Sequence, residues 1–105
     1  MQFLELILYT TDIEGTEKQV EFEVSQNYPN PARNTTYFSV RLEKPALVSI
    51  GITDVSGKSL KGTEKINMDG GLNYYTLDVS DLRSGIYYYT VSANEQKITR
   101  KLIVH

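Results

Sequence analysis

The sequence predicts an all-β protein, an immunoglobulin-like antiparallel β-sandwich of about seven to eight strands. Three observations favour this class. Apolar and polar residues alternate in short runs, turn residues separate the runs at regular spacing, and no segment shows a sustained helical period. The 105 residues suit one domain of ordinary size, and 40% hydrophobic with 23% charged residues is typical of globular proteins.

The first predicted element is a hairpin over residues 4–24. Residues 4–9 and 19–24 alternate between an apolar and a polar face, and residues 11–16 supply the turn, with Gly15 available for positive φ. A lone two-stranded hairpin is marginally stable in water. These strands must therefore pack either on the rest of this chain or on a preceding domain.

Residues 25–34 predict an ordered, extended loop. They hold two prolines and three asparagines, a composition that forbids a central strand. Tyr28 and Asn30 each precede a proline and are restricted to extended conformations. This loop is the best candidate for a boundary, which we place at residue 25.

Strands follow at short spacing after this loop. Residues 58–66 predict one further strand, and residues 86–91 form the most strand-like window. The predicted inward rows are Phe38, Val40 and Leu42; Val48, Ile50 and Ile52; Tyr75, Leu77 and Val79; and Ile98, Leu102 and Val104, the last interrupted by Arg100.

Tight turns connect these strands. Residues 54–58 predict a hairpin turn in which Asp54 accepts from backbone N–H groups two or three residues on, while Gly57 takes a left-handed conformation. The other turns are expected at residues 69–71, at residues 80–85 as one helical turn capped by Ser80 and closed by Gly85, and at Asn94 and Glu95.

Composition and charge exclude several classes of function. A net charge of −2 and a pI of about 5.3 give no basic face for nucleic acid. The absence of cysteine excludes disulfides, thiolate metal sites and cysteine nucleophiles. No apolar run reaches the roughly 20 residues that span a bilayer, so we expect no direct membrane insertion.

We expect no enzyme activity, no metal site and no cofactor. His105 is the only histidine and the last residue, so no second side chain orients it for catalysis. Asp54, Asp69, Asp78 and Asp81 fall near turns, where aspartate accepts backbone N–H groups, and they lack the close alternation of a calcium loop.

A tyrosine cluster leaves one alternative open. Tyr74, Tyr75, Tyr87, Tyr88 and Tyr89 would suit a platform that stacks on sugar rings. Alternation instead predicts Tyr75, Tyr87 and Tyr89 in the core, and Tyr74 and Tyr88 on the outer face or an edge. A structural or carbohydrate-binding immunoglobulin-like accessory module of a surface protein stays as the alternative function.

Four segments carry a motif pattern when they are taken in order. They are the opening motif Asn27, Tyr28, Pro29, Asn30 and Pro31, then residues 48–58, residues 82–89 and residues 97–104. Together they resemble the type A C-terminal sorting domain of the Bacteroidetes type IX (Por) secretion system. The immunoglobulin-like domain of flagellar-hook capping proteins has similar strand and glycine motifs, but the asparagine-proline opening and the basic-apolar ending favour the sorting domain.

The resemblance implies a C-terminal secretion signal. In this family the cargo lies N-terminal to the domain, crosses the inner membrane by its own signal peptide, and is directed through the outer-membrane translocon. A sortase then commonly cuts upstream of the domain, and the cargo is released or attached to the cell surface. The implied partners are translocon and sortase proteins and the cargo. The implied location is secreted or on the outer-membrane cell surface, reached via the periplasm.

The resemblance also divides the chain. Residues 25–105 are then the sorting domain, and residues 1–24 are a hairpin or linker at the tail of the cargo region.

The last predicted strand and two glycine turns are our hypothesis for recognition. A strand edge or a carboxylate at residues 102–105 would suit capture by a receptor, and Lys97, Arg100 and Lys101 are expected to form an outer basic row. Gly57 and Gly85 have a purely conformational role as the alternative. The full hypothesised set for translocon recognition is Gly57, Lys58, Gly85, Lys97, Arg100, Lys101, Leu102, Ile103 and Val104.

Overall fold

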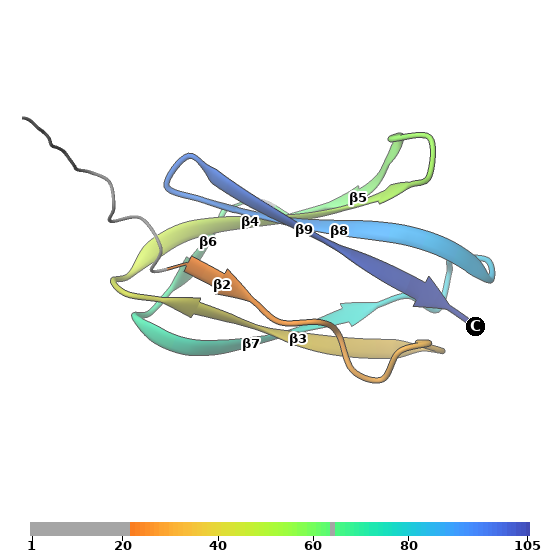
Figure 1. Ribbon diagram of the computed structural model, residues 1–105, viewed down its shortest axis with the longest axis horizontal. Coiled ribbons are helices and arrows are strands. Elements are labelled where there is room, and N and C mark those ends of the chain that lie inside the picture. Colours follow the sequence, from red (N-terminus) through yellow and green to blue (C-terminus); the bar gives the residue numbers. More distant parts are fainter. Residues whose placement is uncertain (1–21, 64) are drawn as a thin grey trace, which may run out of the picture.

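The computed structural model describes residues 22–63 and 65–105, and every regular element in these two ranges is a β-strand (Figure 1). The predicted all-β, immunoglobulin-like antiparallel sandwich is confirmed, whereas the predicted strand at residues 4–9 lies outside the described ranges. In the described part of the chain, no helix could cross a membrane. The strands are β2 (Phe22–Val24), β3 (Thr35–Leu42), β4 (Ala46–Asp54), β5 (Ser59–Gly62), β6 (Ile66–Met68), β7 (Gly71–Asp78), β8 (Gly85–Ala93) and β9 (Gln96–Val104).

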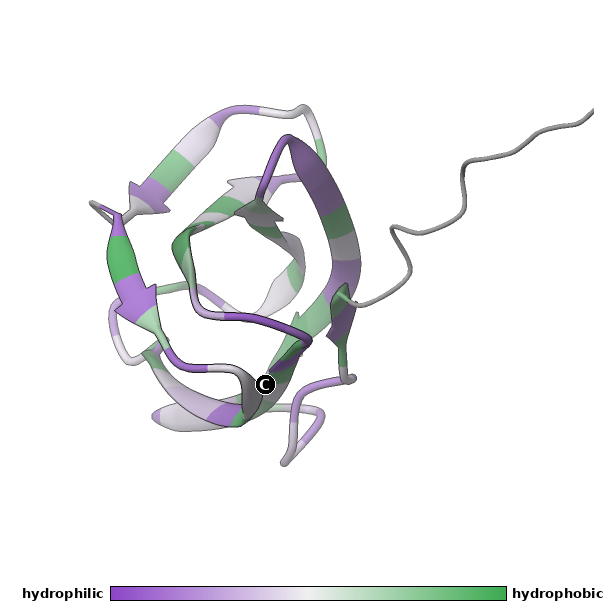
Figure 2. Ribbon diagram, turned by 90° about the vertical axis from the view of Figure 1, so that its left-hand side faces the viewer, coloured by the Kyte–Doolittle hydropathy of each residue, from purple (hydrophilic) through white to green (hydrophobic). Residues whose placement is uncertain are grey.

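The strands form two antiparallel sheets that lie face to face. One sheet has three strands in the order β2-β3-β7, and the other has five, in the order β5-β4-β8-β9 with β6 also paired to β4. Figure 1 shows the sheets as a lower and an upper layer, and Figure 2, from one end, shows the strands around a common interior. Among the described strands, β2 lies at an edge of the first sheet and β9 at an edge of the second.

Alternation along the long strands sends one row of side chains into the space between the sheets. Phe38 of β3 stacks on Tyr89 of β8 in the opposite sheet, with ring centroids 4.6 Å apart. Full burial of an apolar side chain such as Phe38 stabilises the fold by roughly 1.5–3 kcal/mol. The predicted inward rows are confirmed by the burial of Phe38, Val40, Leu42, Val48, Ile50, Ile52, Leu77, Val79, Leu102 and Val104.

β2 brings residues from before the predicted boundary into the sandwich. It pairs with β3 in the register Phe22↔Leu42 and Val24↔Val40. Phe22 and Val24 are both buried in the core. The last three residues of the predicted hairpin therefore pack on this sandwich, and the rest of that hairpin lies outside the described residues.

The corner at residues 80–85 is a turn without a helix, which corrects the predicted helical turn capped by Ser80. One backbone hydrogen bond closes it, from the Leu82 N–H to the Val79 carbonyl at 3.0 Å. Asp78 Oδ1 accepts both the backbone N–H of Ser80, at 3.0 Å, and its hydroxyl, at 2.6 Å. The Ser80 hydroxyl donates to this preceding carboxylate, and among the described residues no following backbone N–H donates to its oxygen.

The strand predicted over residues 58–66 is two strands, β5 and β6, which pair with different parts of β4. Thr63 lies between them. Its N–H donates to the Ile50 carbonyl, and its Oγ1 accepts the Ile50 N–H, both at 2.9 Å. A side-chain oxygen thus replaces a backbone carbonyl at this point, and the regular ladder is interrupted.

The hairpin between β8 and β9 turns at Asn94 and Glu95, as predicted. Their φ angles are +52° and +67°, the pattern of a type I′ turn, whose twist matches that of the flanking strands. The turn sets the register Ala93↔Gln96. In a two-residue hairpin this closing pair is hydrogen-bonded, so the even-numbered residues of β9 bond to β8.

Candidate functional site

One end of the sandwich gathers most of the hypothesised recognition residues. The register pairs Asp54 with Tyr87 and Gly85 with Val104, so the end of β4, the start of β8 and the end of β9 lie together. Figure 1 shows the β4–β5 turn and the C-terminus at this same end. The residues brought there are Gly57, Lys58, Gly85, Leu102, Ile103 and Val104.

The opening loop, residues 25–34, runs alongside the end of β9. Ala32 forms a parallel bridge with Val104. Its N–H donates to the Ile103 carbonyl at 2.8 Å, and its carbonyl accepts the His105 N–H at 2.7 Å. This corrects the expectation that the strand edge at residues 102–105 is open to a receptor, because Ala32 already occupies it.

Two side chains of the loop extend this contact. Gln26 Nε2 donates to the Lys101 carbonyl at 2.6 Å. The Ile103 N–H donates to Asn30 Oδ1 at 3.3 Å. The opening and closing motifs, more than seventy residues apart in the chain, are therefore one structural unit. We call the opening loop (residues 25–34) with residues 101–105 the loop–β9 unit.

A buried amide holds the opening loop in shape. Asn27 is only 3% exposed, and its Nδ2 donates to the Pro29 carbonyl at 3.1 Å and to Thr36 Oγ1 at 3.0 Å. Thr36 Oγ1 itself donates to the Pro29 carbonyl at 2.9 Å. The peptide bonds before Pro29 and Pro31 are cis. The polar motif residues thus satisfy one another and the backbone of the loop.

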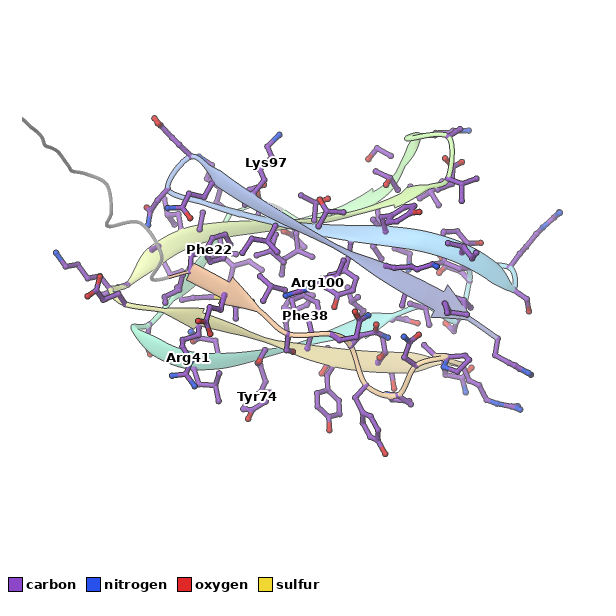
Figure 3. The ribbon with its side chains drawn as sticks, viewed as in Figure 1. Phe22, Phe38, Arg41, Tyr74, Lys97 and Arg100 are labelled. Carbon is purple, nitrogen blue, oxygen red and sulfur yellow. The ribbon has the colours of Figure 1, made fainter. Side chains whose placement is uncertain are left out.

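Arg100 does not belong to an outer basic row, which corrects that expectation. Even-numbered residues of β9 point toward the other sheet, so Arg100 shares a face with Ile98 and Leu102. Its Nε donates to the Val24 carbonyl at 2.9 Å, and Figure 3 shows its side chain between the two layers. Arg100 therefore ties the edge of β9 to the edge of β2.

Lys97 and Lys101 do point outward from β9. Lys101 lies opposite Tyr88 and Lys97 opposite Ser92. Both lysines are exposed. Lys97 follows the Asn94 and Glu95 turn, at the end of the sandwich away from Gly57 and Gly85, so the structure does not bring it together with them.

The turn that carries Gly57 and Lys58 is organised by Asp54, as predicted. Asp54 Oδ1 accepts the backbone N–H of Ser56 at 2.9 Å and that of Lys58 at 3.0 Å. The Ser56 hydroxyl, foremost, and these N–H groups hold the pKa of the Asp54 carboxyl below its usual value. Gly57 has φ +90°, and a Cβ there would meet no heavy atom within 4 Å.

The tyrosine assignments agree with the predicted alternation. Tyr89 is buried, Tyr75 and Tyr87 are half-buried against the core, and Tyr74 is exposed. The Tyr89 hydroxyl donates to the Ser25 carbonyl at 2.7 Å. Burial raises the pKa of Tyr89 to about 12, although Arg100 opposes the shift. The Tyr87 hydroxyl donates to the Arg83 carbonyl at 2.7 Å and so braces the 80–85 corner.

An exposed aromatic row was missed by the sequence reasoning. Tyr28, Tyr37 and Tyr74 are 65%, 44% and 67% exposed, and successive rings meet edge to face, with centroids 5.9 and 6.3 Å apart. Tyr37 lies next to the inward-facing Phe38, which would have indicated its outward direction. The backbone bridge between Tyr28 and Tyr37 brings the opening motif into this row.

Among the described residues, no cluster of three His, Asp or Glu side chains lies close enough to hold a metal ion. A groove of about 230 Å³ separates β4 and β5 from β7 and is lined by Ile52, Lys61 and Leu77, among others. Lys61 Nζ donates to the Asp78 carbonyl and pairs with the Asp81 carboxylate, both at 2.7 Å. These contacts join the two sheets across the groove.

Fold and site together define a small immunoglobulin-like β-sandwich module whose opening and closing motifs are held side by side. Residues 26–105 match the family described as the secretion system C-terminal sorting domain. The chain belongs to this family, and the resemblance to sorting domains of the type IX (Por) secretion system is confirmed. It is a C-terminal sorting signal of a protein that is secreted or exported to the cell surface.

Two solved structures are similar to this chain, and the first of them shares its fold. A structure of dimeric latent PorU from Porphyromonas gingivalis is similar over 88% of this chain, with a TM-score of 0.64 and 17% identity, and the chain spans 10% of that PorU chain. The C-terminal domain of wzt is similar over 84% of this chain and 72% of its own, with a TM-score of 0.47 and 21% identity. No curated protein sequence matches the chain.

Proposed function

We propose that residues 25–105 direct a larger, N-terminal cargo from the periplasm through the outer-membrane translocon of the type IX system. A sortase then cuts upstream of the domain, and residues 1–24 are the tail of the cargo region, whose last three residues pair with β3 of the sandwich as β2. The domain itself is a substrate of this machinery and catalyses no reaction. Membership of the sorting-domain family supports this route.

We further propose that the translocon reads the loop–β9 unit together with the neighbouring turns at Gly57 and Gly85. The supporting observation is the pair of backbone hydrogen bonds that join Ala32 to Ile103 and His105. In an unfolded chain the two motifs would be far apart, so this surface exists only after the domain has folded. A receptor that requires it distinguishes folded cargo tails from unfolded ones.

The binding chemistry at this end is non-covalent. Lys58 and Lys101 supply exposed positive charge, and Ile103 is half-buried. In interfaces with such mixed contacts, the charges orient the partner and raise the association rate, and the apolar side chain adds buried apolar surface.

The test fuses all 105 residues to the C-terminus of an inert reporter that carries a signal peptide, in a host with a type IX system. We expect the fused reporter to be found outside the cell. The same reporter without the 105 residues should stay in the periplasm. A folded fusion that stays periplasmic would refute the sorting role. A matched strain without the translocon should retain the fusion.

The aromatic row of Tyr28, Tyr37 and Tyr74 favours a second candidate, a carbohydrate-binding accessory module. Exposed tyrosine rings offer apolar faces with hydroxyl groups at their edges, and the outward hydroxyl of Thr76 lies opposite Tyr37. A glycan array probed with the 105-residue chain tests it. Binding that Tyr37→Ala and Tyr74→Ala abolish, and that Tyr88→Ala keeps, would support this function.

A further inference from the structure

Half of the outer edge of β9 carries backbone groups without a partner among the described residues. The bonds to the loop come from the Lys101 carbonyl, both groups of Ile103 and the His105 N–H. These are odd-numbered positions, because the even-numbered ones bond to β8. Lys97 and Thr99 therefore direct both backbone groups to this edge, and Lys101 directs its N–H there.

The free half of the edge is also positively charged. Residues 96–105 contain no Asp or Glu, and the exposed Lys97 and Lys101 flank Thr99 on the outward face. Neither lysine forms an ion pair with any described residue. Within residues 22–63 and 65–105, the charge of these two lysines is therefore uncompensated, in a chain whose net charge is −2.

We propose that an extended, acidic segment of an export-machinery protein adds to the sheet as a new strand along Lys97, Thr99 and Lys101. This inference rests on the proposed function and names how one partner binds. Backbone hydrogen bonds to an exposed sheet edge supply affinity in such complexes, and alternate side chains supply specificity. Gln26, bound to the Lys101 carbonyl, ends the free edge and so limits the added strand to a few residues.

Charge decides between this occupant and a second copy of the chain. Two β9 strands paired edge to edge would bring lysines opposite lysines, and like charges directly opposite are destabilising. Lysines on an edge strand are also a common protection against such self-pairing. An incoming strand with acidic residues at every second position would instead place carboxylates beside Lys97 and Lys101.

The backbone part of the proposal is tested with Thr99→Pro. Proline removes the outward N–H and places a ring on the edge, yet proline is tolerated in edge strands where the N–H faces solvent. The Thr99 hydroxyl also lies 2.8 Å from that of Thr90. Thr99→Val is the matched control, because it loses the same hydroxyl contact and keeps the N–H.

The charge part is tested with the double variant Lys97→Glu and Lys101→Glu. Its control is Lys44→Glu with Lys65→Glu, two exposed lysines elsewhere on the sandwich. Thermal unfolding of each 105-residue variant first establishes that it is folded. Export of the corresponding reporter fusions is then measured beside wild type.

We expect Thr99→Pro and the Lys97/Lys101 reversal to lower export about tenfold or more, equivalent to one lost hydrogen bond. Both controls should be exported as wild type. Wild-type export of either test variant would overturn strand addition. If Thr99→Pro does not fold, the charge reversal alone decides. Failure of the wild-type fusion itself would instead refute the proposed sorting role.

Discussion

Among single residues, Asn27 of the opening motif stabilises the opening loop. Its buried amide bonds the Pro29 carbonyl and Thr36 Oγ1, and a buried polar group that loses its partner costs about 1–3 kcal/mol. We expect Asn27→Ala to lower the free energy of unfolding by about that amount. Denaturant melts measure it, and Asn67→Ala, at an exposed position, should change the free energy by less than about 0.5 kcal/mol. Equal effects would contradict this role.

Tyr89 gives the fold an alkaline limit. Its folded pKa of about 12 exceeds the ordinary 10.0, so between these values the unfolded state loses a proton that the folded state keeps. The free energy of unfolding must therefore fall as the pH rises from 10 to 12, by roughly 2–3 kcal/mol from this group, and Tyr89 contributes no pH dependence below that window. Denaturant melts of wild type and Tyr89→Phe across it provide the comparison. Parallel curves would show that Tyr89 is not responsible.

Among the elements, the turn of the β8–β9 hairpin places Glu95 in a backbone conformation that is unfavourable for a residue with a Cβ. Glu95 has φ +67°, where glycine is favoured over residues with a Cβ. We expect Glu95→Gly to raise the free energy of unfolding by about 0.5–1 kcal/mol. Glu43→Gly, at an exposed position with negative φ, should be neutral or destabilising. Loss of stability in Glu95→Gly would contradict the assigned turn.

The edge of β9 should divide into a protected half and an open half. The Ala32 N–H is bonded to the Ile103 carbonyl at 2.8 Å, whereas the Thr99 N–H points to the part of the edge that has no partner among the described residues. Native-state hydrogen exchange should be about a hundredfold slower for Ala32 than for Thr99, corresponding to an opening free energy near 3 kcal/mol. Comparable rates at the two amides would mean that the loop does not stay docked on β9.

In the whole molecule, the alternation of apolar and polar residues predicted which side chains face the space between the two sheets. This was possible because alternation depends only on neighbours in the sequence. The inward rows of β3 and β4, and the inward direction of Tyr89, follow from a period of two. The corner at residues 80–85 was mistaken for a helical turn because the Ser80 hydroxyl was assigned to the wrong partner, and Asp78 takes it. The inward direction of Arg100 follows from its place between Ile98 and Leu102 in the predicted inward row, and the expected outer basic row conflicted with that alternation.

The loop–β9 unit could not be predicted from such periods. The contact between Ala32 and Val104 is a parallel bridge between segments that are far apart in the sequence. No local pattern specifies which strand edge a proline-rich loop will cover. The order of the motifs indicated the family, and the folded structure then showed that two of those motifs touch.

Export of a folded variant with a weakened loop–β9 unit is the most direct test of this account. Gln26→Ala with Asn30→Ala removes the side-chain bonds to the Lys101 carbonyl and the Ile103 N–H. It also removes the bond from Gln26 Nε2 to Asn27 Oδ1 at 2.7 Å, and it changes no apolar core residue. Asn67→Ala with Ser59→Ala is the exposed control. We expect the fraction of reporter outside the cell to fall severalfold for the loop variant and to stay unchanged for the control. A folded loop variant that is exported as efficiently as wild type would contradict it.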